Sequence, residues 1–84
     1  MNTKVMNPQL VEEVIGWLSR ILHKRIDENN LDASLSDEYE ATSMDLVDIV
    51  ESIESKYGLV VKNEEIQNIK TINDILNMIT TKIY

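Results

Sequence analysis

The side chain with the clearest chemical potential is the Ser43 hydroxyl, which stands in the stretch Ala41–Leu46, Ala-Thr-Ser-Met-Asp-Leu. A serine in the first turn of a helix is a suitable carrier of a phosphodiester, because unpaired backbone N–H groups and the positive end of the helix dipole favour an anion there. Thr42 can cap such a helix, which leaves Ser43 free to point outward. The alternative is that Ser43 is itself a structural capping residue.

A conventional catalytic or metal site is not expected. The chain has no cysteine and a single histidine, His23, on which any Ser/His/Asp triad would depend. His23 falls outside the apolar arc of its predicted helix, and a lone exposed histidine with no placed nucleophile is a surface residue in most proteins. No loop has the spacing of calcium ligands with the required glycine. We therefore predict a protein that is not an enzyme.

The element that positions Ser43 is a predicted helix from Thr42 to about Tyr57. Thr42-x-x-Asp45 has the spacing of a capping box, and Gly58 is a suitable residue just after the C-terminus. At about 100° per residue the helix has one apolar face, made of Leu46, Ile49, Val50, Ile53 and Tyr57.

The opposite half of this helix combines carboxylates with two apolar side chains. Its members are Asp45, Asp48, Glu51 and Glu54, with Met44 and Val47 among them. One interpretation is a solvated acidic face with two stray apolar residues, which are common on protein surfaces. The other is a docking surface, on which the carboxylates steer a basic partner and the apolar residues supply contact.

The remaining helices follow from apolar periodicity. A long amphipathic helix is predicted from Leu10 to Ile26, with Pro8 in its first turn and its end near residues 27–30, and Trp17 is placed at the edge of its core face. A short helix is predicted over Asn63–Ile69, capped by Asn63. Thr71-x-x-Asp74 begins a last helix, whose core face contains Ile72, Ile75, Leu76, Ile79 and Ile83.

Two connections complete the predicted fold. Residues 31–41 are predicted to form an ordered loop that Leu35 and Tyr39 attach to the core. Residues 59–61 are predicted to form an extended loop. The fold class is therefore all-α, a small helical bundle of three main helices plus one short helix. We expect one domain spanning residues 1–84, with its core at about 8–83, built from Ile, Leu, Val and Met because the chain has no Phe.

Composition limits the partners of this domain. The chain has 8 basic and 15 acidic residues, a formal net charge of −7, which argues against nucleic acid and anionic membranes and favours basic patches on other proteins. No apolar run approaches the roughly 20 residues of a membrane span, and Met1–Leu10 lacks the apolar core of a secretory signal. We expect a cytoplasmic monomer.

Residues Ala41–Glu54 resemble the signature of the acyl carrier proteins, in which Asp-Ser-Leu-Asp opens an acidic second helix. The likeness extends upstream to Asp32–Leu35, and downstream to Glu64–Glu65 and Lys70–Ile72. It covers roughly Val11–Ile83 and implies an acyl-carrier-like order of helices.

The resemblance also implies a function. A phosphopantetheinyl transferase would attach 4′-phosphopantetheine from coenzyme A to Ser43, and acyl groups would be carried as thioesters on the terminal thiol of this arm. Acyl-transfer and condensing enzymes with basic patches, in fatty-acid, polyketide or other specialised acyl pathways, would bind the docking surface. The resemblance implies that this surface consists of Met44, Asp45, Val47, Asp48, Glu51 and Glu54.

The sequence departs from the family pattern at a few positions. Thr42 replaces the usual Asp, Met44 replaces Leu, Glu40 stands where Gly is usual, and Lys62 where Pro is common. These departures favour a dedicated pathway over the housekeeping fatty-acid carrier. Two alternatives stay open: an aminoacyl or peptidyl carrier, whose usual Gly-Gly or Gly-His before the serine is absent, and an unmodified helical interaction module.

Overall fold

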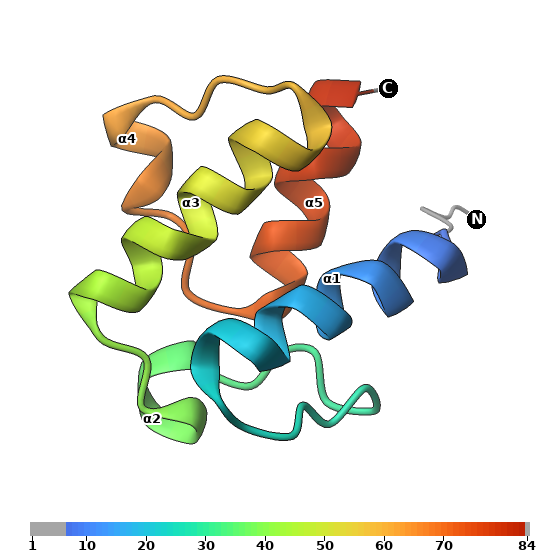
Figure 1. Cartoon of the computed structure of the whole chain (residues 1–84), viewed down its shortest axis with the longest axis vertical. Coiled ribbons are helices and arrows are strands. Elements are labelled where there is room, and N and C mark those ends of the chain that lie inside the picture. The colour runs from blue at the N-terminus through green and yellow to red at the C-terminus, as the bar shows by residue number, and fades with distance from the viewer. Residues whose placement is uncertain (1–6, 84) are drawn as a thin grey trace.

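The computed structural model describes residues 7–83, which form five helices. The three long helices pack on one another, and the two short ones lie in the connections between them (Figure 1). The helices are α1 Pro8–Leu22, α2 Leu35–Tyr39, α3 Ser43–Tyr57, α4 Asn63–Ile66 and α5 Ile72–Ile83. The predicted all-α bundle of three main helices is confirmed, with α2 as an additional short helix that the sequence did not predict. None of the helices in this range is long and apolar enough to cross a membrane.

Helix α1 begins at Pro8 as predicted but ends earlier than its apolar period. His23 adopts a left-handed conformation (φ 56°), and its N–H donates to the Ser19 carbonyl, which terminates the helix after Leu22. Ile26 is nevertheless buried, because the chain beyond His23 returns it to the core without continuing the helix. The apolar period therefore predicted the wrong end for the helix, but it correctly predicted that Ile26 belongs to the core.

The core lies where α1, α3 and α5 meet. Trp17 belongs to it with an exposed fraction of 3%, so its predicted place at the core edge was wrong. The ring can be buried because its Nε1–H donates to Tyr57 Oη at 3.1 Å, which satisfies its single polar group. Among the methionines of the described range none is fully buried. The fully enclosed side chains are Val14, Leu18, Ile49, Ile53, Ile72, Ile75, Leu76 and Ile79.

Helix α2 is a single short turn that holds the loop before α3 in place. Ser34 caps it, accepting the Asp37 N–H at 3.2 Å, and Leu35 and Tyr39 are buried as predicted. The Tyr39 hydroxyl also accepts the Asp27 N–H at 3.1 Å. Five residues are too few to show a helical period, so only the capping residue gave a signal for α2.

The connection before α2 is tied to the start of α5. The Leu35 N–H donates to the Lys70 carbonyl at 2.9 Å, and the Asn73 N–H donates to the Leu31 carbonyl at 3.0 Å. These two backbone bonds attach the segment that leads into α2 to the residues around the start of α5.

Helix α5 begins with the predicted capping box. The Asp74 N–H donates to Thr71 Oγ1 at 3.1 Å, and the Thr71 N–H donates to Asp74 Oδ2 at 2.9 Å. Ile83, predicted on the core face, has an exposed fraction of 43%, because the last turn of α5 lies at the periphery of the bundle (Figure 1).

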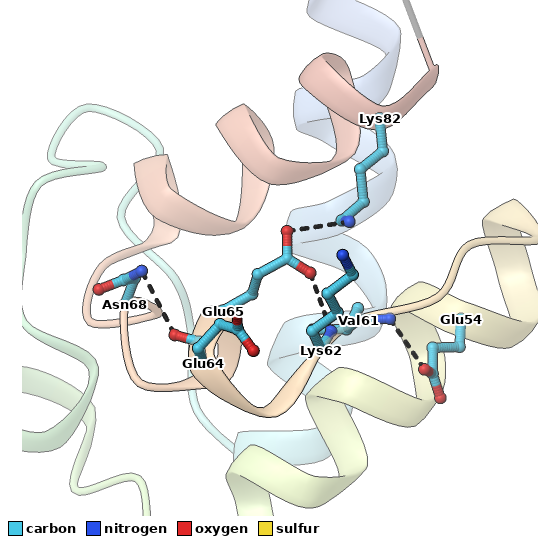
Figure 2. A network of polar contacts seen from close by, with 7 residues as sticks. All are labelled: Glu54, Val61, Lys62, Glu64, Glu65, Asn68 and Lys82. Atoms are coloured by element: carbon cyan, nitrogen blue, oxygen red, sulfur yellow. Dashed lines mark hydrogen bonds and ion pairs between the residues drawn. The ribbon is translucent and has the colours of Figure 1, made fainter.

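Helix α4 is attached to the bundle by polar contacts, shown in Figure 2. The Lys62 N–H donates to Glu65 Oε1 at 2.8 Å, and the other carboxylate oxygen of Glu65 lies 2.9 Å from Lys82 Nζ on α5. The hydrogen bond from Lys62 and the Lys82 ammonium hold the pKa of Glu65 below its ordinary value. Lys62, not Asn63, occupies the N-cap position, because Glu65 lies three residues after Lys62 and accepts its N–H.

The connection between α3 and α4 is extended, as predicted. Its residues alternate in exposure: Leu59 and Val61 face the protein, and Val60 is 73% exposed. Alternation with a period of two is the ordinary consequence of an extended backbone.

Candidate functional site

The start of α3 is closed by a reciprocal pair of hydrogen bonds. The Asp45 N–H donates to Thr42 Oγ1 at 3.2 Å, and the Thr42 N–H donates to Asp45 Oδ2 at 2.9 Å. This is the predicted capping box, with Thr42 as the N-cap. It excludes the interpretation of Ser43 as the capping residue.

Ser43 is the first residue of α3 and its side chain is exposed. No hydrogen bond within residues 7–83 occupies its Oγ. The N–H groups of Ser43 and Met44 belong to the first turn, where a helix offers no intrahelical acceptor. The serine therefore presents a free hydroxyl beside unpaired N–H groups and the positive end of the helix dipole.

A hollow of about 320 Å³ adjoins Ser43. Its walls come from α2, from the first turns of α3, and from the segment that contains α4. Apolar side chains supply much of the lining: Leu35, Leu46, Ile49, Ile66 and Ile69. The sequence placed Leu46 and Ile49 on the core face of the helix, but no pattern indicated that this face is left partly open at its N-terminal end.

The outward face of α3 gathers the predicted docking residues. Met44 and Val47 are 75% and 53% exposed, and Asp48 and Glu51 are exposed beside them. This part of the face has the predicted combination of free carboxylates and apolar contacts.

The other two carboxylates of this face have partners within the protein. Asp45 is half-buried in the capping box. Glu54 is half-buried, and its Oε2 accepts the Val61 N–H at 3.0 Å. The periodicity that placed both residues outward could not reveal these backbone bonds, because it records only the direction of each side chain. Val60, which lies three residues after the end of α3 and is exposed, was not predicted to be exposed. The only signal for it was the extended backbone predicted for residues 59–61, in which side chains alternate between the two sides.

The single histidine lies apart from this arrangement. His23 occupies the C-cap of α1 and is exposed. Across residues 7–83 there is no group of three or more His, Cys, Asp or Glu side chains placed to hold a metal ion.

An exposed serine hydroxyl at a helix start, next to a partly apolar hollow, has room for a covalently attached group. Comparison with known proteins identifies a family with such an attached group. Residues 12–79 match the family described as the phosphopantetheine attachment site.

Relatives cover most of the chain. An acyl carrier protein of Petrotoga mobilis is 39% identical over 75 residues, which are 89% of this chain and 88% of the relative. An acyl carrier protein of Thermotoga maritima is 33% identical over 76 residues, 86% of this chain and 94% of the relative. An acyl carrier protein homolog of Mycoplasmopsis pulmonis is 35% identical over 71 residues, 84% of this chain and 92% of the relative. With a capped α3 opened by an exposed serine and a match over most of its length, the chain belongs to the acyl carrier protein family, whose domain is the attachment site of 4′-phosphopantetheine.

Proposed function

We propose that Ser43 is the residue that carries the 4′-phosphopantetheine arm. The observation that carries this proposal is the capping of α3 by Thr42, which leaves the Ser43 hydroxyl exposed and without a hydrogen bond in the described part of the chain. Ser43 also lies inside the stretch that matches the attachment-site family, residues 12–79.

The residues around Ser43 suit a phosphodiester on its Oγ. The unpaired N–H groups of the first turn of α3 are donors for the phosphate, and the helix dipole favours its negative charge. Lys70 is the cationic side chain of the hollow's lining and supplies a counter-charge on the same side. The arm itself supplies the thiol on which acyl groups are held as thioesters. The chain contains no cysteine, so it offers no competing thiol.

The hollow beside Ser43 is the place where we expect the start of an acyl chain to lie. Leu46 and Ile49 from α3 and Ile66 from α4 give it apolar walls, and covering an apolar chain there removes about 25 cal/mol of unfavourable hydration per Å². A half-open hollow of about 320 Å³ permits both entry and withdrawal.

The exposed face of α3 is the surface that we assign to partner enzymes. It comprises Met44, Asp45, Val47, Asp48, Glu51 and Glu54, of which Asp48 and Glu51 are the carboxylates without a hydrogen-bond partner among the described residues. Because the chain as a whole has a net charge of −7, this face suits a phosphopantetheinyl transferase and acyl-transfer and condensing enzymes that have basic docking patches.

We place this carrier in a fatty-acid or a specialised acyl pathway, such as polyketide assembly, and not among the enzymes. Thr42 supports a specialised role, because it caps α3 without the negative charge that Asp would place beside the arm. An aminoacyl or peptidyl carrier is the alternative. We further infer that residues 1–84 form a single carrier domain, and that the protein is a cytoplasmic monomer.

Intact-mass measurement tests the assignment. The protein is incubated with coenzyme A and a broad-specificity phosphopantetheinyl transferase, and we expect a mass gain of one phosphopantetheine group that is absent from Ser43→Ala. Ser52→Ala, on the same helix, serves as the matched control and should be modified like the parent. If the parent gains no mass, the protein is an unmodified interaction module. If Ser43→Ala gains it, the attachment residue is another one.

A further inference from the structure

The lining of the hollow beside Ser43 has a charge balance opposite to that of the whole chain. The chain has 15 acidic and 8 basic residues. Among the described residues, no aspartate or glutamate lines the hollow, and the charged side chain in its lining is that of Lys70. A site without carboxylates and with an ammonium group suits an anionic ligand and disfavours a cationic one.

The backbone of Lys70 is fixed at the edge of the hollow. Its carbonyl accepts the Leu35 N–H at 2.9 Å, and its N–H donates to Asp74 Oδ2 at 2.9 Å. The same oxygen of Asp74 also accepts the Thr71 N–H at 2.9 Å. The carboxylate that is closest to Lys70 in the hydrogen-bond network therefore serves the backbone at the start of α5.

The ammonium of Lys70 is available to a ligand. Lys70 is exposed, and the ion pairs within residues 7–83 belong to Lys24 and Lys82. A lysine has a flexible stem and three rotatable donors, so it can turn towards an anion at the opening of the hollow. The phosphodiester proposed at Ser43 leaves it this freedom, because the N–H groups of the first turn of α3 are donors for the phosphate.

Polar and apolar residues are separated within the lining. Its apolar members are all buried or half-buried, whereas its exposed members are polar, namely Ser36, Thr42, Ser43, Gln67 and Lys70. A well-matched ligand therefore has methylene groups for the inner walls and a polar or charged end for the opening. A carboxylate at the opening keeps part of its hydration and avoids the cost of burying a charge.

We propose that the acyl group carried by this protein ends in a carboxylate, and that Lys70 selects it. The methylene chain lies against Leu46 and Ile49, and the carboxylate lies at the opening beside the Lys70 ammonium. The inference rests on the proposed function, because the acyl group reaches the hollow on an arm attached to Ser43. It also disfavours the aminoacyl alternative, because an aminoacyl group would bring an ammonium to a hollow whose described lining has no carboxylate.

Three cargoes that differ only in their end group test the proposal. Adipoyl, hexanoyl and δ-aminopentanoyl groups share the same methylene chain and end in a carboxylate, a methyl group and an ammonium group. Each is joined to the coenzyme A arm by an amide in place of the thioester, so that it neither hydrolyses nor cyclises. A broad-specificity phosphopantetheinyl transferase then loads it. Intact mass reports loading, and a protein that is not loaded contradicts the attachment at Ser43, whereas the charge selection is judged on loaded protein alone.

Carbon NMR of the isotopically labelled end carboxyl of the adipoyl group measures the ion pair. We expect its acid dissociation constant to be about 3-fold larger in the parent than in Lys70→Gln, because a neighbouring ammonium favours the carboxylate and an exposed pair has an effect of this size. Lys70→Arg keeps the charge and should titrate like the parent. Lys56→Gln is the matched control, because Lys56 is exposed in the last turn of α3 and its loss changes the net charge equally. Equal constants in the parent and Lys70→Gln, or an equal decrease in Lys56→Gln, overturn the role of Lys70.

The methyl spectra of Leu46 and Ile49 report whether a cargo lies in the hollow. In the parent we expect larger shifts with adipoyl than with δ-aminopentanoyl, and equal shifts with these two cargoes overturn selection by charge. In Lys70→Gln the adipoyl shifts should decrease while the hexanoyl shifts stay as in the parent. A decrease with both cargoes would mean that Lys70 shapes the hollow without selecting a carboxylate, which also overturns the proposal.

Discussion

The Trp17 indole N–H donates to Tyr57 Oη at 3.1 Å and thereby joins the middle of α1 to the last residue of α3. The Tyr57 hydroxyl in turn donates to Glu13 Oε1 at 2.7 Å. Burial and the neighbouring Glu13 carboxylate disfavour the phenolate and raise the pKa of Tyr57 to about 12, even though the Trp17 hydrogen bond acts in the opposite direction.

This relationship predicts a loss of stability at alkaline pH. The folded state binds the Tyr57 proton more tightly than the unfolded state, whose pKa is the ordinary 10.0. The contribution of Tyr57 is therefore complete below pH 10 and is lost as pH rises from 10 towards 12. Urea unfolding of the parent and of Tyr57→Phe across this range measures it. We expect the free energy of unfolding to fall less steeply with pH in Tyr57→Phe than in the parent. An identical fall in the two proteins would show that the pKa of Tyr57 is not raised in the folded state.

The capping box predicts the cost of altering Thr42. Thr42→Ala removes the acceptor of the Asp45 N–H and should lower the free energy of unfolding by about 1 kcal/mol. Thr42→Ser keeps a hydroxyl and should stay close to the parent. Urea unfolding followed by far-UV circular dichroism compares them. Equal stability of the two variants would mean that the cap contributes nothing.

The rotation of α3 predicts contrasting effects at Ile53 and Val47. Ile53 is fully buried, and Ile53→Ala should cost about 2–5 kcal/mol of stability through lost burial and the cavity left behind. Val47 is 53% exposed, and Val47→Ala should stay within about 0.5 kcal/mol of the parent. Chemical denaturation measures both, and a reversal of their order would contradict the orientation of the helix.

The free carboxylates of α3 predict a charge dependence of modification. Reversing one charge turns an attraction of about 1 kcal/mol at contact in water into a repulsion of similar size, a change of about 2 kcal/mol. Asp48→Lys or Glu51→Lys should therefore lower kcat/KM of a basic phosphopantetheinyl transferase about 30-fold. Glu12→Lys, exposed on α1, makes the same change in net charge elsewhere and is the control. The difference should shrink as salt is added. Equal effects of all three substitutions would indicate that only net charge matters.

The two glycines predict opposite responses to alanine. Gly58 has φ 65° with nothing within 4 Å of an added Cβ, so Gly58→Ala should cost about 1 kcal/mol through backbone conformation alone. Gly16 lies within α1, where an added Cβ meets only Arg20 Nη1 at 4.0 Å, and Gly16→Ala should gain about 0.5–1 kcal/mol. Thermal or urea unfolding tests both. Destabilisation by Gly16→Ala would point to a contact of α1 that the packing does not include.

The ends of the helices show where reasoning from the sequence was sufficient. Those of α3 were predicted correctly because a capping box and a glycine are local signals that act within four residues. The end of α1 was not, because Ile26 continues the apolar period although the chain has left the helix at His23. An apolar period records which residues reach the core, and a loop that folds back satisfies it as well as a helix does. The short α2 was missed for a different reason, because its five residues are too few to show an apolar period.

The sequence by itself determined where α3 begins and which of its residues face outward: the Thr42-x-x-Asp45 spacing predicts the cap, and the helical period places Met44, Val47, Asp48 and Glu51 on the outward side. The hydrogen bonds of the cap then excluded Ser43 as the capping residue. These are local relations along one helix. Tertiary structure alone decided three other features. Trp17 is buried with its N–H donated to Tyr57. The hollow forms where residues of α2, of the start of α3 and of the segment containing α4 meet, and Glu54 Oε2 accepts the Val61 N–H. Each of these depends on a residue from another part of the chain, whose distance in space no spacing in the sequence records.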